Sequence, residues 1–315
     1  MKIAYDSTWT PAPGTVAEIE RAERICAQYA AQGYDLTLRQ LYYQFVSRGW
    51  IPNTDKSYKR LGEIINRARL AGMLSWRYIV DRTRSLRGVS HWDTPGDIID
   101  AAASSFRLDK WIDQPTRVEV WVEKEALAGV VQRAAEQRDV SWFSCRGYVS
   151  QSELWGAAQR LIRYVRAGQN VVILHLGDHD PSGIDMTRDI RDRLEMFMSH
   201  HLGSMSGDLE VRRIALNMDQ VRQYDPPPNP AKMSDARAAG YVDRFGDESW
   251  ELDALPPDVL DQLIRDEINE VLDHGRYTEQ ESDETRHREL LAAASERWDE
   301  LVSVLDGDHY DNDQG

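Results

Sequence analysis

Two short apolar runs, each followed at once by acidic residues, constrain the fold of this chain more than any other feature. The first run covers 117–122 and leads into Glu123, and the second covers 171–176 and leads into Asp178 and Asp180. A helix-length segment separates them. Short buried strands that alternate with helices are typical of a parallel sheet built from βαβ units. We therefore predict an α/β protein with a Rossmann-like parallel sheet and flanking helices.

The acidic residues follow the strands at the edge where such sheets bind ligands. Side chains two positions apart in an extended chain point the same way, so Asp178 and Asp180 are expected to face one point while His179 turns aside. Clustered oxygen ligands at an open edge suit Mg²⁺. The alternative is that 178–183 is a solvated turn between a strand and a helix. Glu123, which ends the earlier strand of the same pattern, favours the metal site.

Three segments resemble the motifs of a known family. They are VEKEA at 122–126, RGY at 146–148 and GDHDPSGID at 177–185. They are similar to the Toprim domain, in the version found in the A subunit of topoisomerase VI and its relatives. Those relatives include the meiotic double-strand-break protein and the nuclease subunit of the Wadjet plasmid-defence system. The resemblance implies a Mg²⁺ site, with Mn²⁺ as a substitute, formed by Glu123, Asp178 and Asp180 and acting on nucleic-acid phosphates.

The string TLRQLYYQF at 37–45 resembles the motif that carries the DNA-cleaving tyrosine in topoisomerase VI A subunits. The resemblance implies that Tyr43 is a catalytic nucleophile with Arg39 as its cationic partner, one helical turn earlier. A phenol has a pKa of about 10, so it needs a neighbouring cation or base before it attacks a phosphodiester. From the residues alone, the two adjacent tyrosines among Leu38, Leu41 and Phe45 are most simply explained as core aromatics. The segment 250–257 also resembles a late part of these subunits.

The part before the sheet is predicted to be helical. Helical patterns cover 16–32, 37–47 and 57–71, and a short strand is expected at 76–80. Thr37 and Gln40 have the spacing of a capping box at the start of the second helix. Three helices followed by a basic, strand-like arm indicate a winged helix-turn-helix, in which the third helix is the recognition element.

The net charge of −15 is unevenly distributed. Residues 1–117 contain 17 Lys and Arg against 13 Asp and Glu, and 56–87 contains nine basic residues against two acidic ones. Such a local excess can bind phosphates even on an acidic protein, although a solvated helix face is the alternative. The residues expected to contact DNA are Lys56, Lys59, Arg60, Arg67, Arg69, Arg82, Arg84 and Arg146. For Arg146, a solvated arginine in an ordinary turn is the alternative.

With 315 residues the chain is long enough for two domains. We expect a winged-helix DNA-binding domain at 1–114, a Toprim metal-binding domain at 115–275, and a C-terminal helix with a disordered acidic tail at 276–315. No run of eighteen apolar residues and no basic-then-apolar leader occurs, so no membrane association or secretion is expected. Cys26 and Cys145 lack partner spacing, which favours reduced thiols in a cytoplasmic protein.

The leading interpretation is a Mg²⁺-dependent, topoisomerase VI A-like enzyme that cleaves double-stranded DNA by tyrosine transesterification. The resemblance further implies a homodimer in which the tyrosine of one subunit meets the metal of the other. Such enzymes require a separate ATPase subunit, which nothing in this sequence resembles. Two alternatives stay open. One is a metal-dependent nuclease that uses water as the nucleophile. The other is a non-catalytic DNA-binding regulator or assembly subunit whose acidic residues are structural.

Overall fold

The computed structural model describes residues 2–6, 8–80, 89–202 and 208–311, with side chains as far as 305. A four-stranded sheet has the strand order β2-β1-β3-β4, and its neighbouring strands are all parallel. Its strands are β1 (Thr116–Val122), β2 (Ser141–Ser144), β3 (Asn170–Leu176) and β4 (Leu209–Ala215). The predicted α/β class with a parallel sheet is confirmed.

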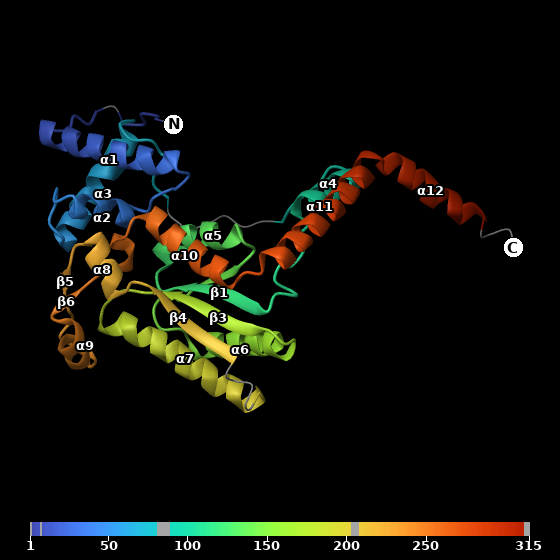
Figure 1. Cartoon of the computed structure of the whole chain (residues 1–315). Helices are drawn as coiled ribbons and strands as arrows, with labels where there is room; N and C mark the ends of the chain where they lie inside the picture. Colours follow the sequence, from blue (N-terminus) through green and yellow to red (C-terminus); the bar gives the residue numbers. More distant parts are fainter. Residues whose placement is uncertain (1, 7, 81–88, 203–207, 312–315) are drawn as a thin grey trace. The chain divides into compact units, whose positions relative to one another are not determined.

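Helices connect the strands and cover both faces of the sheet (Figure 1). After β1 come a short 3-10 turn, η1 (Glu125–Leu127), and α5 (Ala128–Glu136); α6 (Gln151–Arg166) follows β2 and α7 (Pro181–Leu202) follows β3. In Figure 1, α6 and α7 lie on one face, and α5 with α10 (Pro257–Val271) lies on the other. Consequently 117–122 and 171–176 are buried along their whole length, which explains why most of their residues are apolar.

The strand order brings the ends of β1 and β3 side by side. The chain leaves β1 toward β2 on one side and then returns past β1 to form β3 on the other side. Connections that diverge in this way open a crevice at the carboxyl ends of the strands, where such sheets bind ligands. Val122 is paired with Leu176, and the Glu123 amide donates to the Leu176 carbonyl at 2.8 Å. Glu123 therefore starts beside the residues that follow β3.

Three helices precede the sheet, as predicted: α1 (Pro13–Ala31), α2 (Leu38–Ser47) and α3 (Asp55–Leu70). The capping box of Thr37 and Gln40 is present at the start of α2. The prediction of a strand at 76–80 is wrong, because the chain turns there and only Ile79 forms an isolated bridge, with Leu36. The wing of a winged helix is therefore not confirmed among the described residues. Arg82 and Arg84 lie outside them.

The segment between β4 and α10 forms several short elements and then packs against the loop after β3. Its elements are α8 (Met218–Tyr224), β5 (Asn229–Pro230), α9 (Ala238–Phe245), β6 (Glu248–Ser249) and η3 (Leu252–Ala254). Trp250 and His179 exchange both backbone hydrogen bonds, at 2.8 and 2.9 Å. This two-residue ladder holds the segment after β6 against the loop after β3.

Contacts divide the chain into two compact units, one of 1–85 with 116–271 and one of 86–115 with 272–315. In the first unit the leading helices pack on the sheet part, since the Tyr34 hydroxyl donates to Asp261 of α10 at 2.9 Å and Arg133 of α5 donates to the Gln32 carbonyl at 2.9 Å. The leading helices and the sheet, which we predicted as domains 1–114 and 115–275, thus share one unit.

The second unit contains α4 (Pro95–Ser105), α11 (His274–Glu296) and α12 (Trp298–Asp311). Glu284 of α11 accepts from Lys110 at 2.8 Å and from the Leu108 amide at 2.9 Å. α12 extends as far as Asp311, and the disorder expected for the tail stays a prediction. Asp299 and Glu300 in the first turn of α12 favour the helix through its dipole.

Candidate functional site

Glu123 and Asp178 lie in direct contact where the loops after β1 and β3 meet. The Asp178 amide donates to Glu123 Oε2 at 2.8 Å. Gly177 makes this approach possible, because a Cβ atom there would lie 3.0 Å from the same oxygen. Burial raises the pKa of the Glu123 carboxyl above its ordinary value, with Asp180 adding to the effect and the Asp178 amide opposing it. The two predicted ligands from separate strands are thus neighbours.

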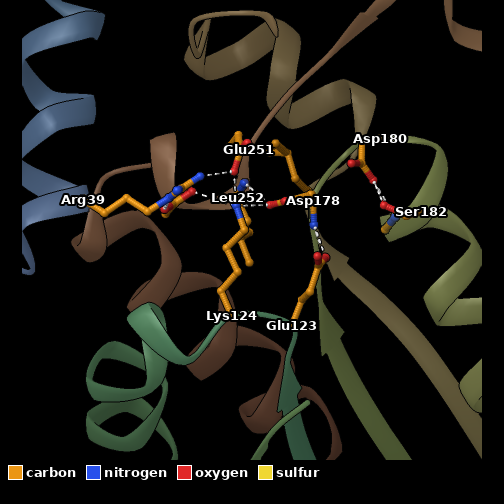
Figure 2. A network of polar contacts seen from close by, with 12 residues as sticks. Arg39, Glu123, Lys124, Asp178, Asp180, Ser182, Glu251 and Leu252 are labelled. Atoms are coloured by element: carbon orange, nitrogen blue, oxygen red, sulfur yellow. Dashed lines mark hydrogen bonds and ion pairs between the residues drawn. The ribbon is translucent and has the colours of Figure 1, made fainter. Parts of the chain in front are cut away.

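Asp178 is almost fully buried and turns toward the segment after β6 (Figure 2). Its Oδ1 accepts from the Leu252 amide at 2.8 Å and lies 2.8 Å from Lys124 Nζ. Burial raises the pKa of Asp178 to about 8; the Lys124 ammonium opposes this rise, while the nearby carboxylate of Glu123 increases it. A buried carboxylate among other carboxylates is stabilised by an added cation.

Asp180 turns to another partner, so the two aspartates do not face one point in this structure (Figure 2). Its Oδ1 accepts from the Gly183 amide at 2.6 Å and from the Ser182 hydroxyl at 2.9 Å, which is the pattern of a helix N-cap at the start of α7. The extended geometry behind our expectation ends with β3, at Leu176. Gly183 is required there, since a Cβ atom would lie 2.2 Å from the Asp178 carbonyl oxygen.

His179 turns aside, as predicted. Its ring is buried, with Nδ1 lying 2.8 Å from the Tyr241 hydroxyl, and it packs edge-on against Phe245 and Trp250. Burial lowers the pKa of His179 to about 4, so the ring is neutral at physiological pH. His179 therefore serves to hold the loop in place rather than to face the site.

Two acidic residues that the sequence analysis missed complete the cluster: Glu251 and Asp253. Lys124 Nζ lies 2.9 Å from Asp253 Oδ1 and also contacts Glu251 (Figure 2). Arg39 of α2 reaches the same pair, with Nε 2.7 Å from Asp253 Oδ2 and one terminal nitrogen 2.8 Å from Glu251 Oε2. Both acids lie, two positions apart, in the segment 250–257, which resembles a late part of topoisomerase VI A subunits. This resemblance was the signal from which the two residues could have been found.

Oxygens of Asp178, Glu251 and Asp253 all lie within 4.8 Å of one another, a spacing at which carboxylates can bind a metal ion. Glu123 and Asp180 do not belong to this group of described residues. Each of the three predicted ligands nevertheless has one oxygen fixed by a local hydrogen bond: Oε2 of Glu123, Oδ1 of Asp178 and Oδ1 of Asp180. Within the described ranges nothing bonds their other oxygens, and such a donor set fits a hard divalent cation.

Tyr43 lies beside Arg39, as the i, i+4 spacing predicts, with its hydroxyl 3.4 Å from the guanidinium. The side chain is buried, and burial raises the pKa of the phenol above its ordinary value of 10. Asp253 and Glu251 raise it further, whereas Arg39 lowers it. Burial is the largest of these effects, so the net shift of the Tyr43 pKa is opposite to the one that would activate a nucleophile.

A cavity of about 230 Å³ connects the tyrosine with the acidic residues. Tyr43 and Arg39 from α2, Asp178 and Asp180 from the loop after β3, and Glu251 all line it. Residues that lie far apart in the sequence thus face one space within the first unit.

The basic residues predicted to contact DNA differ in whether another group of the protein already binds them. Lys56 and Lys59 are exposed on α3, and Arg67, also exposed, lies over the Trp9 ring at 5.3 Å. Arg60 is bound by Glu18 at 2.9 Å, and Arg146 by Glu125 at 3.1 Å. Arg69 lies over the Trp76 ring and donates to the Trp76 and Ile79 carbonyls, so it stabilises the turn after α3.

The sequence matches no model of a known protein family, and it matches no curated protein. The resemblance to the Toprim family therefore rests on the motifs themselves.

Throughout the described residues, no helix combines the length and apolar character needed to span a membrane.

Proposed function

We propose that this chain is a divalent-metal-dependent enzyme that cleaves phosphodiester bonds of double-stranded DNA, with Tyr43 as the nucleophile. The observation that carries the proposal is that Tyr43 lines the same cavity as Asp178 and Asp180, while Glu123 is bonded to the Asp178 backbone. Glu123, Asp178 and Asp180 would hold Mg²⁺, or Mn²⁺ in its place, through their remaining oxygens. The ion would supply stabilisation of the charge that develops on the phosphate.

In this reaction the Tyr43 oxygen forms a bond to phosphorus as the bond to the leaving sugar oxygen breaks. The phenol loses its proton and the leaving oxygen gains one, so a phosphotyrosyl link and a free hydroxyl result. Arg39 favours the phenolate, because its guanidinium lies 3.4 Å from the Tyr43 hydroxyl and lowers the phenol pKa against the effect of burial. One chain supplies both the tyrosine and the acidic residues, so the proposal does not require a partner's tyrosine.

A second candidate is hydrolysis, in which a water molecule replaces Tyr43 as the nucleophile. The raised pKa of Tyr43 favours it, because a buried phenol with a raised pKa is a weak nucleophile at neutral pH. The bonds of Arg39 to Glu251 and Asp253 favour it too, since they divert the cation from the tyrosine.

The choice of DNA as the substrate is supported by the exposed lysines of α3, Lys56 and Lys59. Basic side chains on one helix bind phosphates through charge, whatever the base sequence. A homodimer and an ATPase subunit stay predictions from the resemblance. If the protein binds DNA without breaking it, the remaining interpretation is a non-catalytic DNA-binding regulator or assembly subunit.

The test is cleavage of supercoiled plasmid in Mg²⁺ or Mn²⁺, stopped with detergent and scored for nicked, linear and protein-linked DNA. We expect protein-linked breaks from the unsubstituted chain and none from Tyr43→Phe or Asp178→Ala. Tyr29→Phe is the matched control, because Tyr29 is another buried tyrosine whose side chain does not line the cavity. Breaks without linked protein that persist in Tyr43→Phe would favour hydrolysis. Intact plasmid in both metals would refute both enzymatic candidates.

A further inference from the structure

We propose that the ammonium group of Lys124 is the built-in cation of the cluster formed by Asp178, Glu251 and Asp253. With this cation in place, the chain binds a single divalent ion, beside the Asp178 oxygen that does not contact Lys124. No divalent ion binds within the cluster. The position of that single ion rests on the proposed function, whereas the role of Lys124 rests on the cluster alone.

The ammonium group of Lys124 occupies the space between the carboxylates of the cluster. Lys124 Nζ is 2.8 Å from Asp178 Oδ1 and 2.9 Å from Asp253 Oδ1, and it contacts Glu251 as well. A metal ion bound by these carboxylates would need the place where the ammonium lies. Two cations at such a separation repel each other strongly in a buried environment. The spacing that suits a metal ion is therefore explained by the lysine.

The carboxylate oxygens of the cluster are used differently. Asp253 has no exposed side-chain surface, and its two oxygens are both taken, Oδ1 by Lys124 and Oδ2 by Arg39. Glu251 shares its Oε2 between the same two cations, and Asp178 contacts Lys124 through its Oδ1. Within the described residues, the second oxygen of Glu251 and that of Asp178 have no hydrogen bond. Of these two residues, Asp178 is the one whose backbone amide is bonded to Glu123, so Asp178 is the link between the ammonium and the proposed metal.

The position of Lys124 is fixed by its surroundings. It follows Glu123 at the end of β1, and its side chain is only 17% exposed. Its ammonium group contacts the carboxylates of Asp178, Glu251 and Asp253. The attraction between Lys124 and Asp178 fixes the direction of the Asp178 carboxylate.

The experiment counts bound Mn²⁺ per chain by calorimetry and by electron paramagnetic resonance of the free ion. We expect one ion in the unsubstituted chain, two in Lys124→Gln, and one in Lys124→Arg, which retains the cation. Lys110→Gln is the matched control, because Lys110 is another buried lysine bound to a carboxylate, Glu284 at 2.8 Å. It should leave the count at one.

A variant that does not require the loss of the lysine keeps the inference testable if Lys124→Gln fails to fold. In the otherwise unsubstituted chain, Glu251→Gln should keep the single ion, whereas Glu123→Gln should lose it. Loss of the ion in Glu251→Gln, or two ions in the unsubstituted chain, would overturn the inference. No ion in the unsubstituted chain but one in Lys124→Gln would refute the proposed metal site and support the role of Lys124.

Discussion

Replacement of Asp253 by alanine is the most severe test of the charge network, which consists of Arg39, Lys124 and their carboxylate partners. The Asp253 carboxylate joins the leading helices of the first unit to its sheet part. Its Oδ2 is bonded to Arg39 of α2 at 2.7 Å, and its Oδ1 to Lys124 after β1 at 2.9 Å. The Asp253 side chain is fully buried, and its loss removes one carboxylate partner from each of these two cations. Asp253→Ala should therefore lower the free energy of unfolding.

The size of the loss follows from these contacts. A hydrogen bond to a charged group contributes about 1.5–3 kcal/mol, so two such bonds set an upper range of roughly 3–6 kcal/mol. The Arg39 side chain is 42% exposed and can regain water, and Lys124 keeps Asp178 and Glu251. We therefore expect a loss of about 3 kcal/mol, which corresponds to a fall in Tm of roughly 6–12 °C for a unit of this size.

Urea denaturation and scanning calorimetry, both with chelator present, measure this loss directly. Asp243→Ala is the control, because Asp243 is exposed on α9, and it should change stability by less than about 0.5 kcal/mol. A loss below about 1 kcal/mol in Asp253→Ala would refute our reasoning that the network holds α2 against the sheet part.

Three further predictions address other parts of the first unit. Burial lowers the pKa of His175 to about 3, so the unfolded chain binds more protons than the folded chain between this value and about 6.5. Stability should be complete above about pH 6.5 and fall by up to about 1.4 kcal/mol per pH unit below it, a dependence that unfolding curves of His175→Gln should lack. Lys56→Ala with Lys59→Ala should weaken plasmid binding and reduce its salt dependence, measured by fluorescence anisotropy, whereas Arg60→Ala should have a smaller effect because Arg60 is bound by Glu18. Gly183→Ala should abolish cleavage and lower Tm, since its Cβ atom would lie 2.2 Å from the Asp178 carbonyl oxygen; activity and Tm at the level of the unsubstituted chain would contradict this.

The sheet could be predicted from the sequence because its signals are local. The runs at 117–122 and 171–176 are mostly apolar since helices cover both faces, and each of these two strands begins within one residue of the predicted start. The capping box at Thr37 is likewise a local pattern, and it lies where predicted. Glu123 and Asp178 could be predicted to meet because parallel strands end at the same edge.

The network around Lys124 could not be predicted in this way. It depends on the pairing of His179 with Trp250, which brings a distant segment to the end of β3. The direction of Asp180 was not predictable from the strand period either, because the residue caps α7 instead of extending β3. The expected strand at 76–80 illustrates the same limit, since β-branched and aromatic residues there form a turn that Arg69 stabilises.

Mass spectrometry of the protein recovered after plasmid cleavage tests the central claim most directly. The DNA is digested with nucleases, the protein with protease, and peptides are searched for a covalently attached nucleotide. We predict a single modified peptide, with the nucleotide on Tyr43, formed only when Mg²⁺ or Mn²⁺ is present. Broken plasmid with no nucleotide on Tyr43, or with a nucleotide on a different residue, would contradict the account.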